Sequence, residues 1–134
     1  MDKTTRENLS TAMHGEAYAY AKYMLFAQRA RQTGNPDLAQ LLEKTANEEL
    51  LEHFAEEAAL AEIVRSDGDN LQEAIASESF EIETMYREFA ERAFSTGDKA
   101  AGELFEEIRH DEMKHRDAFK KVLSRLAESR SRQF

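Results

Sequence analysis

The sequence of 134 residues contains no cysteine and no tryptophan, and it has one proline and five glycines. Without cysteine the chain can form no disulfide, no thiolate nucleophile and no cysteine-ligated iron or zinc centre. The scarcity of proline and glycine, beside abundant Ala, Leu, Glu, Lys and Arg, favours helices. A chain of this length forms one domain with a sizeable core, so we expect a single all-α domain.

Positive charge is also scarce: 18 Lys and Arg stand against 27 Asp and Glu, a formal net charge of -9. Contacts with nucleic-acid phosphates need clustered basic residues, so no nucleic-acid partner is expected. No apolar run approaches the roughly 20 residues of a membrane-spanning helix, so no membrane partner is expected either. The first residues lack the apolar segment of a signal peptide, and we therefore expect a cytoplasmic protein.

Four amphipathic segments follow one another, and glycine and proline separate the first two. Gly34 suits a left-handed helix end, and Pro36 suits the first turn of the next helix. A polar run with one glycine, at 66–70, separates the two halves of the chain. We predict a first helical hairpin over about 5–64, a linker over 65–70 and a second hairpin over about 71–128.

The two halves repeat each other at an offset of 63 residues, as from Phe26 to Phe89. The match is Phe26-Ala27-x-Arg29-Ala30-x-x-Thr33-Gly34 against Phe89-Ala90-x-Arg92-Ala93-x-x-Thr96-Gly97. At the same offset Glu49 pairs with Glu112. The identities far exceed the roughly two expected by chance from average residue usage. A duplicated hairpin explains the repeat, and two such hairpins make a four-helix bundle.

The linker limits how the two hairpins can combine. If Glu49 and Glu78 lie at one level of the bundle, the second segment ends well past that level and the third begins well before it. At a rise of 1.5 Å per helical residue, the connection between these two ends must run back along the bundle for about 33 Å. That distance takes about ten extended residues, more than 65–70 supply. Exchange of hairpins between two chains removes the difficulty, so we predict a homodimer with swapped hairpins.

Glutamate and histidine occupy positions that are expected to face the core. In the fourth segment, Glu112 and His115 interrupt a clean apolar stripe and share one helix face. Glu78 and Glu81 share a face of the third segment, and Glu16 stands in a small-residue stretch of the first. Buried carboxylates in such numbers would repel one another and be desolvated at large cost unless cations neutralised them.

This arrangement predicts a pair of metal ions inside the bundle. A Glu from each of two helices and Glu-x-x-His from each of the other two is the ligand pattern of di-iron and di-manganese carboxylate proteins. Mixed oxygen and nitrogen ligands suit iron or manganese better than structural zinc, which prefers cysteine and histidine.

The spacing in the second segment departs from that pattern. Three residues after Glu49 comes Glu52, and His53 is one residue later. Either Glu52 takes the ligand position, as the register of the repeat favours, or one extra residue forms a π-bulge that turns His53 inward, as ligand chemistry favours. We predict His53. A similar one-residue difference between the first and third segments predicts a π-bulge in the third.

Motifs spread over nearly the whole chain resemble those of one known family. They are Gly15-Glu16 with Tyr23 and Phe26-Ala27, Thr45-Ala46 with Glu49, Glu78-x-x-Glu81 with Met85-Tyr86, and Asp111-Glu112-x-x-His115. In these features the chain resembles the rubrerythrins of the ferritin-like superfamily. The resemblance implies a di-iron site, with His53 added by the argument above: Glu16, Glu49, His53, Glu78, Glu81, Glu112 and His115. Tyr23 and Tyr86 are expected in the core, close enough to support a ligand carboxylate by hydrogen bonding.

The resemblance also implies an activity. Rubrerythrins reduce hydrogen peroxide to water in defence against oxidative stress, with electrons delivered to two iron ions; manganese would suit the same ligands. Typical members carry a rubredoxin-like domain with four cysteines, so this cysteine-free chain is expected to be a short form served by an unknown electron-donor protein. Two alternatives stay open: a ferroxidase or iron-handling protein that uses O₂, and a metal-free helical interaction module.

Overall fold

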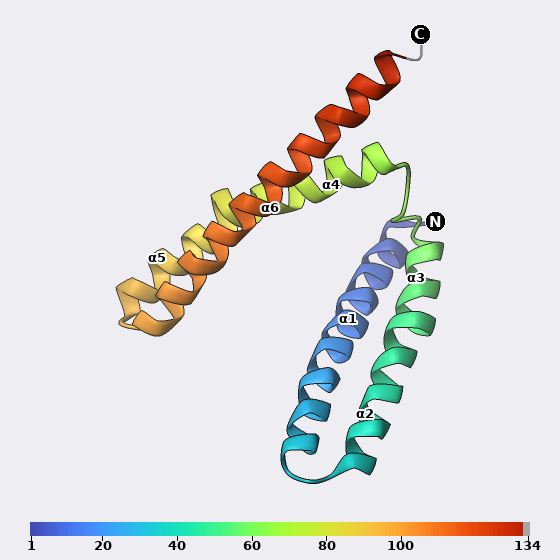
Figure 1. The fold of residues 1–134 in the computed structure, drawn as a ribbon, viewed down its shortest axis with the longest axis vertical. Coiled ribbons are helices and arrows are strands. Elements are labelled where there is room, and N and C mark those ends of the chain that lie inside the picture. The colour runs from blue at the N-terminus through green and yellow to red at the C-terminus, as the bar shows by residue number, and fades with distance from the viewer. Residues whose placement is uncertain (133–134) are drawn as a thin grey trace. The chain divides into compact units, whose positions relative to one another are not determined.

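The computed structural model describes residues 1–132, which divide into two compact units between Val64 and Arg65. Each unit is a pair of antiparallel helices (Figure 1). The predicted all-α fold is confirmed, because residues 1–132 contain helices and turns and no strand. Across the same residues, no helix combines the length and the apolar character that crossing a bilayer requires.

The first hairpin packs one long helix against a composite one. Its elements are α1 (Lys3–Gln32), α2 (Pro36–Glu48), the π-helical segment η1 (Glu49–Phe54) and α3 (Ala55–Leu60). The carboxylate of Asp2 begins α1 by accepting a hydrogen bond from the N–H of Thr5 at 3.1 Å. Pro36 occupies the first turn of α2, as predicted.

The second hairpin has the reverse order, with the composite helix first. Its elements are α4 (Asp67–Phe80), the π-helical segment η2 (Glu81–Met85), α5 (Tyr86–Thr96) and α6 (Lys99–Ser131). The helix begins at Asp67, inside the stretch predicted as a linker, because Ser66 caps it. The Ser66 hydroxyl accepts from the N–H of Asp69 at 3.2 Å and donates to the Asp69 carboxylate at 2.7 Å.

The turns of the two hairpins have the same hydrogen bonds, which reflects the sequence repeat. In the first, Gly34 has φ 78° and the N–H of Asn35 donates to the Ala30 carbonyl at 2.8 Å. In the second, Gly97 has φ 86° and the N–H of Asp98 donates to the Ala93 carbonyl at 2.8 Å. This is a Schellman ending, whose left-handed residue is usually glycine.

A third Schellman ending closes α3, but with a glutamate in the left-handed position. Glu62 has φ 53°, and the N–H of Ile63 donates to the Ala58 carbonyl at 3.3 Å. The second helix therefore ends at Leu60, before the predicted end of the first hairpin at about residue 64. A non-glycine residue in this conformation brings its Cβ close to backbone oxygen, which costs stability.

Replacing Glu62 with glycine should therefore stabilise the protein by about 0.5–1 kcal/mol, since glycine carries no Cβ. The change is measured as a shift in the urea midpoint at a fixed protein concentration. Ala59→Gly, three residues earlier inside α3, is the matched control and should destabilise by about 1 kcal/mol. A lower midpoint for Glu62→Gly would contradict the assignment of strain to this residue.

The buried core of each hairpin is made almost entirely of alanine. In the first hairpin these residues are Ala27, Ala30, Ala39, Ala46 and Ala58, and in the second they are Ile82, Ala90 and Ala93. Small side chains allow the two helices of a hairpin to approach closely, but they remove little apolar area from water. Each hairpin therefore gains only modest stability from its own core.

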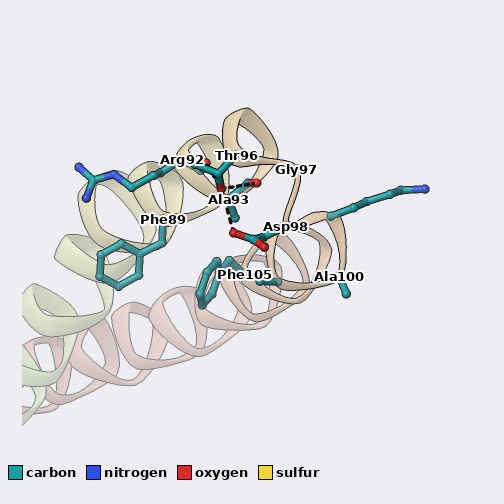
Figure 2. Close-up of a pocket in the computed structure, with 10 residues that line it drawn as sticks. Phe89, Arg92, Ala93, Thr96, Gly97, Asp98, Ala100 and Phe105 are labelled. Atoms are coloured by element: carbon teal, nitrogen blue, oxygen red, sulfur yellow. Dashed lines mark hydrogen bonds between the residues drawn. The ribbon is translucent and has the colours of Figure 1, made fainter.

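Larger apolar side chains lie largely exposed in both hairpins, at matching positions of the repeat. Phe26 and Phe89 are 50% and 45% exposed, and Leu41 and Leu104 are 60% and 52% exposed. At the turn of the second hairpin, an open cavity of about 1000 Å³ is lined by the rings of Phe89 and Phe105 (Figure 2). The uncovered apolar surface is thus a property of the repeat.

Candidate metal centre

The first hairpin brings together three predicted ligands, one from α1 and two from η1. Each of Glu16, Glu49 and His53 offers a ligand atom, and these atoms lie within 4.8 Å of one another. His53 Nδ1 lies 3.3 Å from a carboxylate oxygen of Glu49 and 3.7 Å from one of Glu16. The two carboxylates are half-buried, whereas the imidazole is exposed.

The second hairpin carries a matching group on α4 and α6. Ligand atoms of Glu78, Glu112 and His115 also lie within 4.8 Å of one another. His115 Nδ1 lies 3.7 Å from Glu78 Oε1 and 3.6 Å from Glu112 Oε2. Again two half-buried glutamates accompany one exposed histidine. We call these two groups the first and the second half-site.

The predicted π-bulge in the second helix is present as η1. Here the N–H of Ala55 reaches the Leu50 carbonyl, five residues back instead of four. With this geometry His53 stands beside Glu49, while Glu52 is exposed and belongs to neither half-site. The arrangement favours the histidine over the glutamate as the ligand from this turn.

The predicted π-bulge in the third helix is present as η2, which begins at Glu81. Glu81 is half-buried, but the second half-site gathers Glu78, Glu112 and His115 without it. Its role as a ligand stays a prediction.

The two predicted tyrosines are half-buried among aromatic rings. Tyr23 lies 6.3 Å from Phe26 between ring centroids, and Tyr86 lies 6.1 Å from Phe105. Within residues 1–132, no hydrogen bond joins either hydroxyl to a glutamate of its own hairpin. The expected support of a ligand carboxylate is therefore not formed inside a single hairpin.

The other two histidines lie outside both half-sites. His14 Nδ1 is 2.7 Å from the Ser10 carbonyl, and His110 Nδ1 is 3.3 Å from the Glu106 carbonyl. The Glu107-x-x-His110 sequence therefore has ligand spacing without the ligand geometry. It provides a natural control for experiments on His115.

In the first half-site, the two carboxylates and the imidazole shift one another's pKa values. A hydrogen bond with Glu49, then burial and the charge of Glu49, raise the pKa of Glu16. The same hydrogen bond lowers the pKa of Glu49, and the bond from His53 lowers it further. Hydrogen bonding to Glu49 in turn raises the pKa of His53 above its ordinary value. A cation bound here would require the imidazole to be neutral and the carboxylates to be ionised.

In the metal-free protein, His53 should therefore titrate at a higher pH than a free histidine. Protonation of His53 contributes to the free energy of unfolding of the hairpin. This contribution is complete at pH values below the ordinary histidine pKa, and it is lost as the pH rises through the raised pKa of the folded state. Metal binding has the opposite dependence and tightens as pH rises, because the imidazole must be neutral to bind a cation.

The His53 titration can be followed by NMR of the ring protons in metal-free protein. Glu49→Gln should move the His53 pKa towards the ordinary value, because it removes the carboxylate whose hydrogen bond and charge raise that pKa. Glu52→Gln, on the same turn but outside the half-site, is the control. An unchanged His53 pKa in Glu49→Gln would contradict the assigned hydrogen bond.

Within residues 1–132, two buried carboxylate oxygens lack a hydrogen-bond partner. One is Glu78 Oε2, in the second half-site. A buried carboxylate oxygen without a partner is costly, and a bound cation would remove that cost. The residues present therefore suit the metal ions that the sequence predicts.

The other oxygen without a partner belongs to Glu57, which is not among the predicted ligands. The charge of Glu57 contributes to the raised pKa of Glu16, after the effects of Glu49 and of burial. Glu57 follows His53 by four residues, which places them on one helix face. That spacing was readable in the sequence, but Glu57 stood among several glutamates expected to face water.

Comparison with known proteins places this chain in a family. The rubrerythrin family model matches residues 7–53 and 49–123. The chain is 32% identical to nigerythrin from Nitratidesulfovibrio vulgaris, over 87% of this chain and 64% of that protein. It is 30% identical to a rubrerythrin from Porphyromonas gingivalis, over 91% of this chain and 67% of that protein.

Among solved structures, the fully reduced, all-ferrous state of nigerythrin matches with a TM-score of 0.48 and 31% sequence identity. That match covers 92% of this chain and 67% of the nigerythrin chain. In the sequence comparison, this chain spans 64% of nigerythrin, slightly less than two thirds of its length.

Proposed function

Because the chain belongs to the rubrerythrin family, we propose that it is a non-haem di-iron peroxidase that reduces hydrogen peroxide to water. The observation that carries the proposal is the pair of half-sites, one on each hairpin, each with two glutamates and one histidine. Three ligands per hairpin are too few for a pair of ions, whereas the two half-sites together match a di-metal carboxylate centre.

The residues that would hold the metal are those of the two half-sites together with Glu81. Reduction of one peroxide needs two electrons and two protons, and two ferrous ions would supply the electrons when bound. The protein's part is to hold the ions and to manage protons. A hydrogen bond with Glu49 and the charge of Glu49 raise the pKa of Glu16, so Glu16 takes up a proton more readily than Glu49.

We propose that the half-sites meet by exchange of hairpins in a homodimer. The matching apolar side chains exposed on both hairpins need cover, and packing hairpin on hairpin supplies it. If Glu49 and Glu78 lie at one level of a bundle, the end of α3 and the start of α4 are still separated by about 33 Å along the bundle. The connection 61–66 reaches at most about 23 Å when extended. A dimer with exchanged hairpins covers the apolar side chains and does not require the short connection to return along the bundle.

We further propose a cytoplasmic protein that receives its electrons from a separate donor protein. Its chain contains no cysteine, so a cysteine-ligated iron inside these 134 residues cannot be the donor.

The proposed activity is tested by stopped-flow reoxidation of the di-ferrous protein. A peroxidase should be oxidised much faster by hydrogen peroxide than by O₂, with one peroxide consumed for each pair of ferrous ions. Faster oxidation by O₂, with ferric iron accumulating on addition of Fe²⁺, would indicate an iron-handling protein instead. Purified protein that takes up well under two metals per site would indicate a helical interaction module.

A further inference from the structure

The π-bulge in the third helix leaves one backbone carbonyl without its usual partner. In an α-helix, the N–H of Tyr86 would bond to the carbonyl of Ile82, four residues back. Here it bonds to the carbonyl of Glu81, five residues back. Ile82 is only 2% exposed, so its carbonyl needs a partner from the protein.

Arg109 of α6 supplies that partner. Its Nε donates to the Ile82 carbonyl oxygen at 2.7 Å, across 27 residues of sequence. The arginine side chain is 23% exposed, and its Nη1 lies 3.6 Å from a carboxylate oxygen of Glu106. The guanidinium is therefore held between its own helix and η2, one turn before Glu112.

The first hairpin shows what happens where no such arginine is present. In η1, the N–H of Ala55 bonds to the Leu50 carbonyl and leaves the Leu51 carbonyl free. Leu51 is 68% exposed, so water can satisfy that carbonyl.

The repeat counterpart of Arg109 is Ala46, which is fully buried in the first hairpin. The long helix α1 contains no π-helical segment. The arginine and the inward-facing bulge thus occur together, in the second hairpin alone among residues 1–132.

We propose that Arg109 is a positioning residue of the metal centre, acting through the bulge. One residue corresponds to about 100° of helix rotation. Relaxation of η2 to a regular α-helix would therefore turn Glu78 and Glu81 by about that angle relative to α5. The bond from Arg109 keeps the extra residue inside η2, and Glu78 consequently faces Glu112 and His115. This inference rests on the di-metal site proposed above.

Three measurements on Arg109→Gln test the proposal. In the metal-free protein, amide hydrogen exchange at 81–87 should become faster. Metal analysis should show loss of bound iron, and the Mössbauer doublets of protein loaded with excess iron should change. Arg109→Lys keeps a cationic donor and should restore part of each property. Arg116→Gln is the control, because Arg116 has similar exposure and lies 3.7 Å from the Glu83 carboxylate without binding a backbone carbonyl.

A deletion separates positioning from general stabilisation. Arg109→Gln should lower the thermal midpoint of the otherwise unmodified protein, because the buried Ile82 carbonyl loses its partner. Removing Glu83 takes the extra residue out of η2, so in that background Arg109→Gln should no longer lower the midpoint. Lower stability with unchanged exchange at 81–87 and unchanged Mössbauer doublets would overturn the proposal. So would an Arg116→Gln variant with the same losses as Arg109→Gln. If the unmodified protein binds no metal, the proposed function fails, and the exchange rates alone decide whether Arg109 holds η2.

Discussion

Replacing His53 with leucine is expected to weaken metal binding by more than about 100-fold, since loss of a group that merely supports a ligand already costs 10–100-fold. His53 is the single nitrogen ligand of the first half-site. Leucine keeps a comparable volume on an exposed position of η1, so the hairpin should stay folded. Calorimetric titration with Fe²⁺ under anaerobic conditions measures the affinity, and circular dichroism checks the fold.

Glu52→Gln is the matched control for this experiment. Glu52 stands on the same turn and is the alternative ligand in the register of the repeat, but it lies outside the half-site. Its replacement should leave the affinity unchanged. The reverse pattern, with loss in Glu52→Gln and none in His53→Leu, would show that η1 rearranges when metal binds.

Two inactive variants are expected to restore one metal site between them when they share a dimer. One variant carries Glu49→Gln and His53→Leu in the first hairpin, and the other carries Glu112→Gln and His115→Leu in the second. With exchanged hairpins, one site of the mixed dimer receives both damaged halves and the other receives both intact halves. The mixed dimer should therefore bind about half the metal of the unmodified dimer.

The measurement requires dimers that contain one copy of each variant. Two different affinity tags and co-expression give this species, and metal analysis follows purification through both tags. Each variant alone is the control and should bind no metal pair. A mixed dimer that is equally devoid of metal would mean that each chain closes its own site, and the proposed exchange would be wrong.

The helices and turns could be predicted because their signals are local. Gly34 and Pro36 mark a turn through the conformations that only their own backbones favour. The bulge at η1 was predictable for a different reason, since Glu49 and His53 are one residue too far apart for the Glu-x-x-His pattern. Both signals are contained in a few neighbouring residues.

Features that depend on a partner helix could not be read in the same way. Arg109 resembles any helical arginine until the free carbonyl of Ile82, 27 residues earlier in sequence, is known. Glu57 resembles a solvent-exposed helix residue until one of its carboxylate oxygens is found buried without a hydrogen-bond partner. The early start of α4 at Asp67 was missed because the Ser66 cap resembles a loop in its composition.

The two π-bulges also say how a duplicated protein can diverge without losing a shared site. A one-residue difference in helix length normally turns every later side chain by about 100° and would scatter a set of ligands. A π-bulge confines that difference to a single turn. Each copy of the hairpin has taken its bulge in a different helix, η1 on the side of the histidine and η2 on the side of the lone glutamates. The two copies would thereby give unequal surroundings to the pair of ions proposed above.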